Sequence, residues 1–482
     1  MIQQIKNLAR HSSIYTFSTF LQRALGFIML PIYTDVLYIS KTAYGDLILV
    51  YTFVAFMTVI YLYGMDAALL RYFFLGKFKR EEVYKTGFMG VLANSLLLSG
   101  LLFILAEPIG NLILGGNGYG TFIRLAAVIM FLDGLGNLPY LVLRAEEKSI
   151  TYSVLRIGRF VVEVALNILF VVVWRYGVIG ILYANALASF LNLVALLPFQ
   201  NKYIRAPFNK EAFKTLAAFG LPMIPNGIAY LTVEMSDKYL MRFLLGKETM
   251  ALYSASYKFG SLLLLLVIAF RTAWQPFFLR IAKEEESPQR IYARVLTYFF
   301  LIGSFIVVTG SYFVEYIVKL PLGGGRTLLG HAYWGGIIII PLILTAYLFY
   351  GLYVNFTVGI YIKKKTQWMV LFTGLAAVAN VGSNFYLMPR FGIMGAAVAT
   401  LLSYVIMTLA IWIVNQRLYP VRYEYGRLFI ILIYLTGMLF VLYYFNPGFG
   451  LRVVLILLSP ALFLAGGFLK KEELQVLKRW RK

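Results

Sequence analysis

The chain has 482 residues, of which 61% are hydrophobic and 13% are charged, and its mean hydropathy is +0.78. This balance excludes a soluble domain, and the recurring apolar runs of about 20 residues are typical of a polytopic helical membrane protein. The formal net charge of +23 would suggest nucleic-acid binding in a soluble chain, but the sequence contains no basic domain to carry it, so we expect no nucleic-acid partner. The absence of cysteine and the presence of only two histidines exclude disulfides, thiolate chemistry and a histidine-based metal site.

Fourteen segments are long and apolar enough to be membrane spans, so we predict an all-α protein with about fourteen transmembrane helices. Arg23 interrupts the first segment and no small-residue cleavage site follows, which argues against a cleaved signal peptide. The predicted spans are Ser12–Leu37, Tyr44–Phe74, Thr86–Ala106, Phe122–Arg144, Thr151–Trp174, Val178–Pro198, Phe213–Val233, Leu252–Phe278, Tyr292–Val318, Tyr333–Ile362, Gln367–Met388, Ile393–Asn415, Arg427–Phe445 and Leu451–Phe468.

The connections between these spans alternate sharply in charge. One set of alternate connections holds about 28 basic residues and the other set holds about 9. Because cytoplasmic loops carry the excess of Lys and Arg, we place the basic set and both chain termini in the cytoplasm. An even number of spans agrees with this placement.

Two stretches of the sequence are similar to each other without gaps. The segment WRYGVIGILYANAL (Trp174–Leu187) matches PRFGIMGAAVATLL (Pro389–Leu402). We predict two six-helix lobes, residues 1–200 and 201–418, followed by two further transmembrane helices and a basic tail in residues 419–482. Such parallel repeats are related by an axis along the membrane normal, with a substrate site between them. Chance agreement of small residues in apolar helices is the alternative explanation.

Seven basic residues lie within predicted spans, where a charge at the bilayer centre costs about 2.5–3.5 kcal/mol on insertion scales. Arg71 and Arg124 are close enough to helix ends for their charged groups to reach the interface. Arg156, Arg159 and Glu163 are spaced three and four residues apart, so they share one face of a helix. The other basic residues are Arg23 in the first span and Lys258 and Arg271 in the eighth.

The eighth span, Leu252–Phe278, follows a short charged connection that starts at Asp237, and we expect Pro276 to break it. Lys258 and Arg271 are thirteen residues apart, which corresponds to about 20 Å of rise and about 220° of rotation on a helix. They can therefore border one cavity only if the helix bends or borders that cavity broadly. Two such charges on one helix require a wet or anionic surrounding rather than lipid.

Two interpretations of these charges are open. In the first, each basic residue pairs with an acidic one, and the candidates are Asp66, Asp133, Glu163, Glu234 and Asp237. In the second, the basic residues, which outnumber these carboxylates, line a cationic cavity that attracts an anion. We predict such a cavity, and its candidate substrate-binding residues are Arg23, Arg156, Arg159, Lys258 and Arg271.

The sequence resembles a known family. The run Asp237-Lys238-Tyr239, Gly246, Tyr253-Ser254 and Ala273-Trp274-Gln275-Pro276-Phe277-Phe278 is similar to the second half of Wzx-type polysaccharide flippases. The pattern Arg23, Pro31, Leu37 and Tyr44-Gly45 is similar to their first half. These flippases belong to the multidrug/oligosaccharidyl-lipid/polysaccharide exporter superfamily. The resemblance implies two six-helix lobes that face each other in a V, with helices one and eight beside a lateral portal.

The resemblance also implies a function, which is transport and not an enzymatic reaction. A flippase in the bacterial cytoplasmic membrane would move an undecaprenyl-pyrophosphate-linked oligosaccharide outward by alternating access, for O-antigen or capsule synthesis. Arg23 and the two basic residues of the eighth span would attract the pyrophosphate. The partners of such a flippase would be the lipid-linked glycan, membrane lipids and polysaccharide assembly proteins. No cofactor is expected, and a second hypothesis couples transport to protons or sodium through Asp133, Glu163 or Asp237.

Three other functions remain alternatives. A lipid II flippase would have the same fold and the same cationic cavity. A multidrug exporter of the same superfamily would need an acidic or aromatic cavity for cationic drugs, whereas this sequence offers the opposite charge. A membrane polysaccharide polymerase or ligase would be an enzyme and would need a large external loop, whereas the predicted external loops are short.

Overall fold

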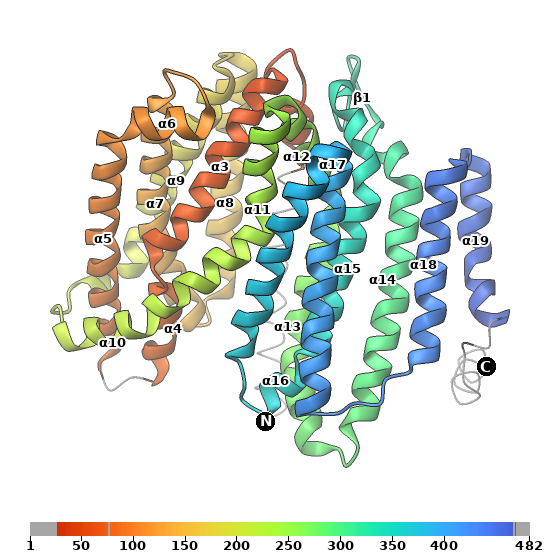
Figure 1. Ribbon diagram of the computed structural model, residues 1–482. Coiled ribbons are helices and arrows are strands. Elements are labelled where there is room, and N and C mark those ends of the chain that lie inside the picture. The colour runs from red at the N-terminus through yellow and green to blue at the C-terminus, as the bar shows by residue number, and fades with distance from the viewer. Residues whose placement is uncertain (1–26, 76–77, 466–467, 469–482) are drawn as a thin grey trace. The chain divides into compact units, whose positions relative to one another are not determined.

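The computed structural model describes residues 27–75, 78–465 and 468. These residues are helical almost throughout and include a two-stranded hairpin, so the prediction of an all-α polytopic protein is confirmed (Figure 1). They divide after Ser254 into two compact units, and Leu329–Ala332 belongs with the first unit. This short segment packs on the first unit because the Gly330 amide donates to Thr34 Oγ1 at 3.0 Å.

The first unit contains the elements from α2 to α11 and the beginning of α12. They are α2 (Leu30–Tyr33), α3 (Lys41–Leu62), α4 (Met65–Leu75), α5 (Arg80–Ile104), α6 (Ala106–Leu114), α7 (Gly120–Ala145), α8 (Ser149–Asn167), the π-helix η1 (Ile168–Val173), α9 (Gly177–Ile204), α10 (Lys210–Gly220), the 3₁₀ helix η2 (Leu221–Met223), α11 (Ile224–Leu245) and α12 (Lys247–Gly260).

The second unit contains the end of α12 and the elements that follow it, apart from the first two residues of η3. They are α13 (Leu262–Glu284), α14 (Pro288–Val318), the strands β1 (Pro321–Gly323) and β2 (Arg326–Thr327), the 3₁₀ helix η3 (His331–Ile339), α15 (Ile340–Phe356), α16 (Val358–Ile362), α17 (Trp368–Leu418), α18 (Tyr425–Phe445) and α19 (Phe449–Ala465).

Ten of the described helical segments are long and apolar enough to cross a membrane. The difference from the fourteen predicted spans has identifiable causes. Most of the first predicted span lies outside the described residues, α8 carries three charged residues, and α19 is short. In addition, α17 contains two predicted spans, which are joined at Gly392 with a φ of 57° and a ψ of −134°.

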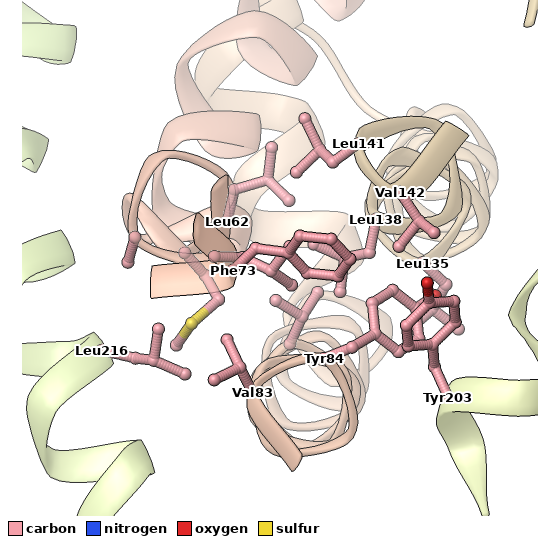
Figure 2. Close-up of a cluster of buried hydrophobic side chains, with 14 of the residues drawn as sticks. Leu62, Phe73, Val83, Tyr84, Leu135, Leu138, Leu141, Val142, Tyr203 and Leu216 are labelled. Atoms are coloured by element: carbon pink, nitrogen blue, oxygen red, sulfur yellow. The ribbon is translucent and has the colours of Figure 1, made fainter. Parts of the chain in front are cut away.

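The core of the first unit lies where α3, α4, α5, α7, α9 and α10 meet. Buried side chains from these helices converge there, and Figure 2 shows Phe73 and Tyr84 near the centre of the group. The Tyr84 hydroxyl donates to Gln200 Oε1 at 2.8 Å, so the one polar atom of this ring is satisfied within the apolar cluster. This packing fixes α7 and α9, which carry several of the residues discussed below.

The predicted second span is two helices in the structure. Tyr63 and Gly64 have φ angles of 35° and 71°, and this left-handed turn separates α3 from α4. Gly64 is required here for two reasons: its φ favours glycine, and a Cβ at this position would overlap the backbone of Gly220 at the end of α10. The close approach of the two glycines also brings the end of α10 against the turn between α3 and α4.

The boundary between the two units differs from the predicted lobe boundary after residue 200. The reason is that α10, α11 and the start of α12 pack with the helices before them, and Lys247 forms an ion pair with Asp46 of α3 at 2.5 Å. The predicted lobes are defined by the sequence repeat rather than by packing, so they stay a prediction. One feature supports the repeat: the aligned Gly177 and Gly392 share a positive φ, 58° and 57°.

Candidate functional site

Arg23 lies outside the described residues. The other candidates fall into two groups, one in each compact unit. The first unit holds Asp133 on α7, Arg156, Arg159 and Glu163 on α8, and Asp237 on α11. The second unit holds Lys258 on α12 and Arg271 on α13.

Arg159 is paired with a carboxylate. Its Nη2 lies 2.9 Å from Asp133 Oδ1 and donates to Ser189 Oγ of α9 at 2.9 Å. The network continues from Ser189 through Asn185 to the Tyr51 hydroxyl of α3, with distances of 3.3 and 2.8 Å. Arg159 thus connects α7, α8 and α9, and for this residue the structure agrees with the pairing interpretation of its charge.

Glu163 lies one helical turn beyond Arg159 on α8. Its carboxylate is close enough to Arg159 and Asp133 to interact with both electrostatically. Nearby, Asn167 donates to the Glu163 carbonyl at 2.8 Å and accepts from the Tyr33 hydroxyl at 2.9 Å. Asp133, Arg159 and Glu163 therefore form one charged cluster among apolar helices, with two carboxylates against one guanidinium.

Arg156 has a different environment. Its guanidinium carbon lies 4.1 Å from the centre of the Tyr140 ring and 5.5 Å from that of Tyr152. No carboxylate of the described residues forms an ion pair with it, and its Nε is buried without a hydrogen bond. The Tyr140 hydroxyl donates to Asn192 of α9 at 2.6 Å, which holds the ring under the guanidinium. Arg156 is stabilised by aromatic faces, and no carboxylate of the described part of the chain neutralises its charge.

Arg271 is also held by aromatic side chains. Its Nη1 donates to the Tyr350 hydroxyl of α15 at 3.4 Å, and Tyr350 stacks on Tyr353 with a centroid distance of 5.9 Å. The side chain is exposed, and no carboxylate of the described residues forms an ion pair with it. Arg271 and Arg156 therefore share one property: the guanidinium lies beside tyrosine, and among the described residues it has no acidic partner.

The predicted eighth span is wrong in two details. First, it is interrupted at Ser261, where the Ser261 hydroxyl donates to the Lys258 carbonyl at 2.7 Å. Lys258, which is half-buried, therefore lies on α12, whereas Arg271 lies on the separate helix α13. Second, Pro276 does not end the helix, because α13 continues to Glu284. Proline removes a single amide donor, and Trp274 packs within α13 against Phe270 before Pro276 and against Phe278 after it.

Asp237 does not lie in a connection, which corrects the predicted end of the seventh span at Val233. α11 continues to Leu245, and Asp237 within it is fully buried. Its Oδ2 accepts from the Tyr253 hydroxyl of α12 at 2.7 Å and its Oδ1 lies 3.6 Å from Lys238 Nζ. These contacts offset the cost of a buried carboxylate, so the helix need not end before it.

Asp46 was not among the predicted residues. It is 7% exposed, forms the ion pair with Lys247, and accepts from the Tyr119 hydroxyl at 3.3 Å. The sequence contains a signal, since Asp46 is a carboxylate inside a predicted span, whereas its partner Lys247 lies between the predicted seventh and eighth spans. The group joins α3 to the start of α12 and the start of α7, and all of it lies in the first unit.

The described residues contain no group of three or more His, Cys, Asp or Glu side chains arranged to hold a metal ion. The chemistry that these residues offer is electrostatic. Arg156 and Arg271 can attract an anion, and the cluster of Asp133, Arg159 and Glu163 can exchange a cation or a proton.

Comparison with known proteins gives a family and a fold. The family described as "Polysaccharide biosynthesis protein" matches residues 37–325, more than half of the chain. A search of curated proteins found no match. The structure is similar to that of "Lipid II flippase MurJ, inward closed conformation", with 16% identity and a TM-score of 0.70 over 94% of this chain and 97% of that one.

Two further structures are similar over most of the chain. One is the inward-facing conformation of a multidrug resistance MATE family transporter of the MOP superfamily, with 14% identity, a TM-score of 0.66 and coverage of 83% of this chain and 94% of that one. The other is an outward-facing conformation, with 15% identity, a TM-score of 0.58 and coverage of 84% and 95%. At these identities the likeness establishes a shared fold.

We predict that the Asp133 and Arg159 pair contributes to stability through mutual interaction. Removing either charge leaves the other partly buried without its partner, so the losses of stability caused by Asp133→Asn and by Arg159→Gln should add up to more than the loss in the double variant. A double-mutant cycle on unfolding in detergent should give a coupling of about 1 kcal/mol or more.

The same cycle on Arg280 and Glu284 serves as the control. This pair is 3.8 Å apart and its side chains are 52% and 61% exposed, so its coupling should be close to zero. Equal coupling in both cycles would contradict the assignment of a structural ion pair to Arg159.

Proposed function

Because the chain belongs to the polysaccharide biosynthesis protein family, we propose that it is a flippase for undecaprenyl-pyrophosphate-linked oligosaccharide repeat units. The family match together with the fold shared with MurJ and MATE transporters confirms the resemblance drawn from the sequence. In this proposal the protein moves the repeat unit from the inner to the outer leaflet by alternating access, and the product serves O-antigen or capsule synthesis. The protein performs no chemical step on its substrate.

The observation that carries the proposal is the pair of arginines without acidic partners among the described residues. Arg156 and Arg271 each lie in or beside apolar helices, and each is held by tyrosines. A guanidinium that keeps its full charge and spare N–H groups presents the fork that binds phosphate oxygens. We assign these two residues, with Arg23 and Lys258, to binding of the pyrophosphate. Arg159 is assigned to the same group, with its charge moderated by Asp133.

The membrane potential supplies a driving force for an anionic substrate. Each negative charge that moves outward across an inside-negative potential gains about 2.3 kcal/mol per 100 mV. A dianionic pyrophosphate can thus be driven outward in part by the potential. The proposed location is the bacterial cytoplasmic membrane with both termini inside, and it is supported by the concentration of basic residues in alternate connections.

A lipid II flippase is the second candidate function. The observation that favours it is the similarity to the structure described as a lipid II flippase, which spans 94% of this chain. Both substrates present a pyrophosphate on a polyprenyl tail, so the cationic residues alone do not distinguish them. The two differ in the glycan, and transport measured with each substrate in turn separates them.

We predict that Arg271→Gln and Arg156→Gln each reduce transport by about tenfold or more, because a hydrogen bond to a charged group is worth about 1.5–3 kcal/mol. Arg23→Ala should behave similarly. The measurement supplies labelled lipid-linked repeat unit on one side of proteoliposomes and scores its appearance on the other side. Lipid II is supplied in a parallel experiment.

The matched control for Arg271→Gln is Arg280→Gln on the same helix. Arg280 is exposed and pairs with Glu284, so its loss should leave transport unchanged. Tyr350→Phe, which removes the hydroxyl that holds Arg271, should give an intermediate rate. Normal transport by both Arg156→Gln and Arg271→Gln would contradict the proposed site, and transport of lipid II alone would replace the proposed substrate.

We further propose that transport is coupled to inward protons or sodium through Asp133, Glu163 or Asp237. Support comes from the excess of carboxylates over guanidinium in the α7 and α8 cluster and from the burial of Asp237. At a fixed potential, an inward proton or sodium gradient should accelerate transport by the natural protein and have no effect on Asp133→Asn or Glu163→Gln. Insensitivity of the natural protein to both gradients would remove this proposal.

A further inference from the structure

A pocket in the second unit is lined by three arginines. It has a volume of about 560 Å³ and lies at the start of α14, beside the segment that connects α17 to α18. Its polar lining residues are Ser287, Gln289, Arg290, Arg294, Arg422 and Glu424. None of these residues is among those assigned to transport.

The pocket carries a large excess of positive charge. Arg290 and Arg294 are one helical turn apart on α14, and Arg422 reaches the same space from the connecting segment. Among the lining residues, Glu424 supplies the single negative charge, and it accepts a hydrogen bond from the buried Arg427 at 2.9 Å. Among the lining residues, three guanidinium groups therefore face one carboxylate.

The chemistry of the lining is suited to a phosphate group. Guanidinium groups bind phosphate oxygens in a bidentate manner, and the Ser287 hydroxyl and Gln289 amide add neutral donors. Ser287 is also the residue before the first turn of α14, a helix of 31 residues whose N-terminal end favours negative charge. Glu285 and Glu286 precede it in the chain but do not line the pocket.

The position of the pocket indicates where such a phosphate comes from. It lies at the ends of two candidate membrane spans, Pro288–Val318 and Tyr425–Phe445. Tyr423 and Tyr425 are in edge-to-face contact beside it, with centroids 6.3 Å apart, and tyrosines are typical of the interface between lipid and water. Headgroups of anionic phospholipids are concentrated at that level of a membrane, most of all in the cytoplasmic leaflet.

We propose that this pocket binds the headgroup of an anionic phospholipid. The three arginines contact the phosphodiester, and the acyl chains extend along the apolar surfaces of α14 and α18. The bound lipid ties the start of α14 to the segment between α17 and α18 and so stabilises the second unit. The ordinary alternative is that these arginines act only as general cytoplasmic charge that orients the chain. That role needs no convergence of the side chains on one pocket.

The test measures the melting temperature of the full-length protein in neutral detergent as phosphatidylglycerol is added. We expect phosphatidylglycerol to raise the melting temperature and phosphatidylcholine to have little effect. In Arg290→Gln/Arg294→Gln/Arg422→Gln, the concentration for half-maximal stabilisation should rise about fivefold per arginine removed, or about a hundredfold in all.

The control removes the same number of charges elsewhere. Arg205→Gln/Lys210→Gln/Arg417→Gln changes three exposed basic residues of the same predicted side, none of which lines the pocket, and should respond like the natural protein. If the first triple variant does not fold, Arg422→Gln alone, outside any helix, should show a shift of about fivefold.

Three outcomes would overturn the proposal. An unchanged response in the pocket variants would show that the pocket does not bind the lipid. An equal loss in the control triple variant would assign the effect to general surface charge. Stabilisation of the natural protein by inorganic phosphate at the same concentration as phosphatidylglycerol would replace the lipid by free phosphate as the ligand.

Discussion

The structure depends on how it accommodates positive charge among apolar helices. A charge at the bilayer centre costs about 2.5–3.5 kcal/mol on insertion scales, so each such residue needs a compensating environment. The described residues show two such environments. Arg159 is neutralised by Asp133 and tied to α9 through Ser189. Arg156 and Arg271 are instead held by tyrosines, which orient the guanidinium without neutralising it.

The two environments correspond to two roles. A guanidinium that is paired with a carboxylate connects helices and attracts a further anion less strongly than an unpaired one does. An oriented guanidinium without a carboxylate partner attracts an anion, and under the proposed function that anion is the pyrophosphate of the cargo. The proposed flippase function rests on this distinction, together with the family to which the chain belongs. The cationic pocket at the start of α14 extends the same chemistry to a lipid that is retained instead of transported.

The class and most spans could be predicted from the sequence, because hydropathy and spacing reflect the membrane and the helix period directly. Asp133 is among the acidic partners that the sequence offers for the intramembrane basic residues, and the structure pairs it with Arg159. The sequence did not place the break at Ser261 or the extension of α11 through Asp237. Both depend on partners distant in sequence or on local backbone geometry, such as the Tyr253 hydroxyl that satisfies Asp237. The left-handed turn at Gly64 likewise depends on Gly220, more than 150 residues away.

The proposed function requires Arg271 and Arg156 to face water and not lipid. The chain contains no cysteine, so single thiols can be introduced without altering the background. A membrane-impermeant, negatively charged thiol reagent should label Arg271→Cys and Arg156→Cys in intact membranes, and lipid-linked oligosaccharide should protect both. It should not label Leu457→Cys, which replaces an exposed apolar residue of α19. Labelling of both arginine positions with protection by substrate is the predicted result, and thiols at 271 and 156 as unreactive as that at 457 would contradict the account.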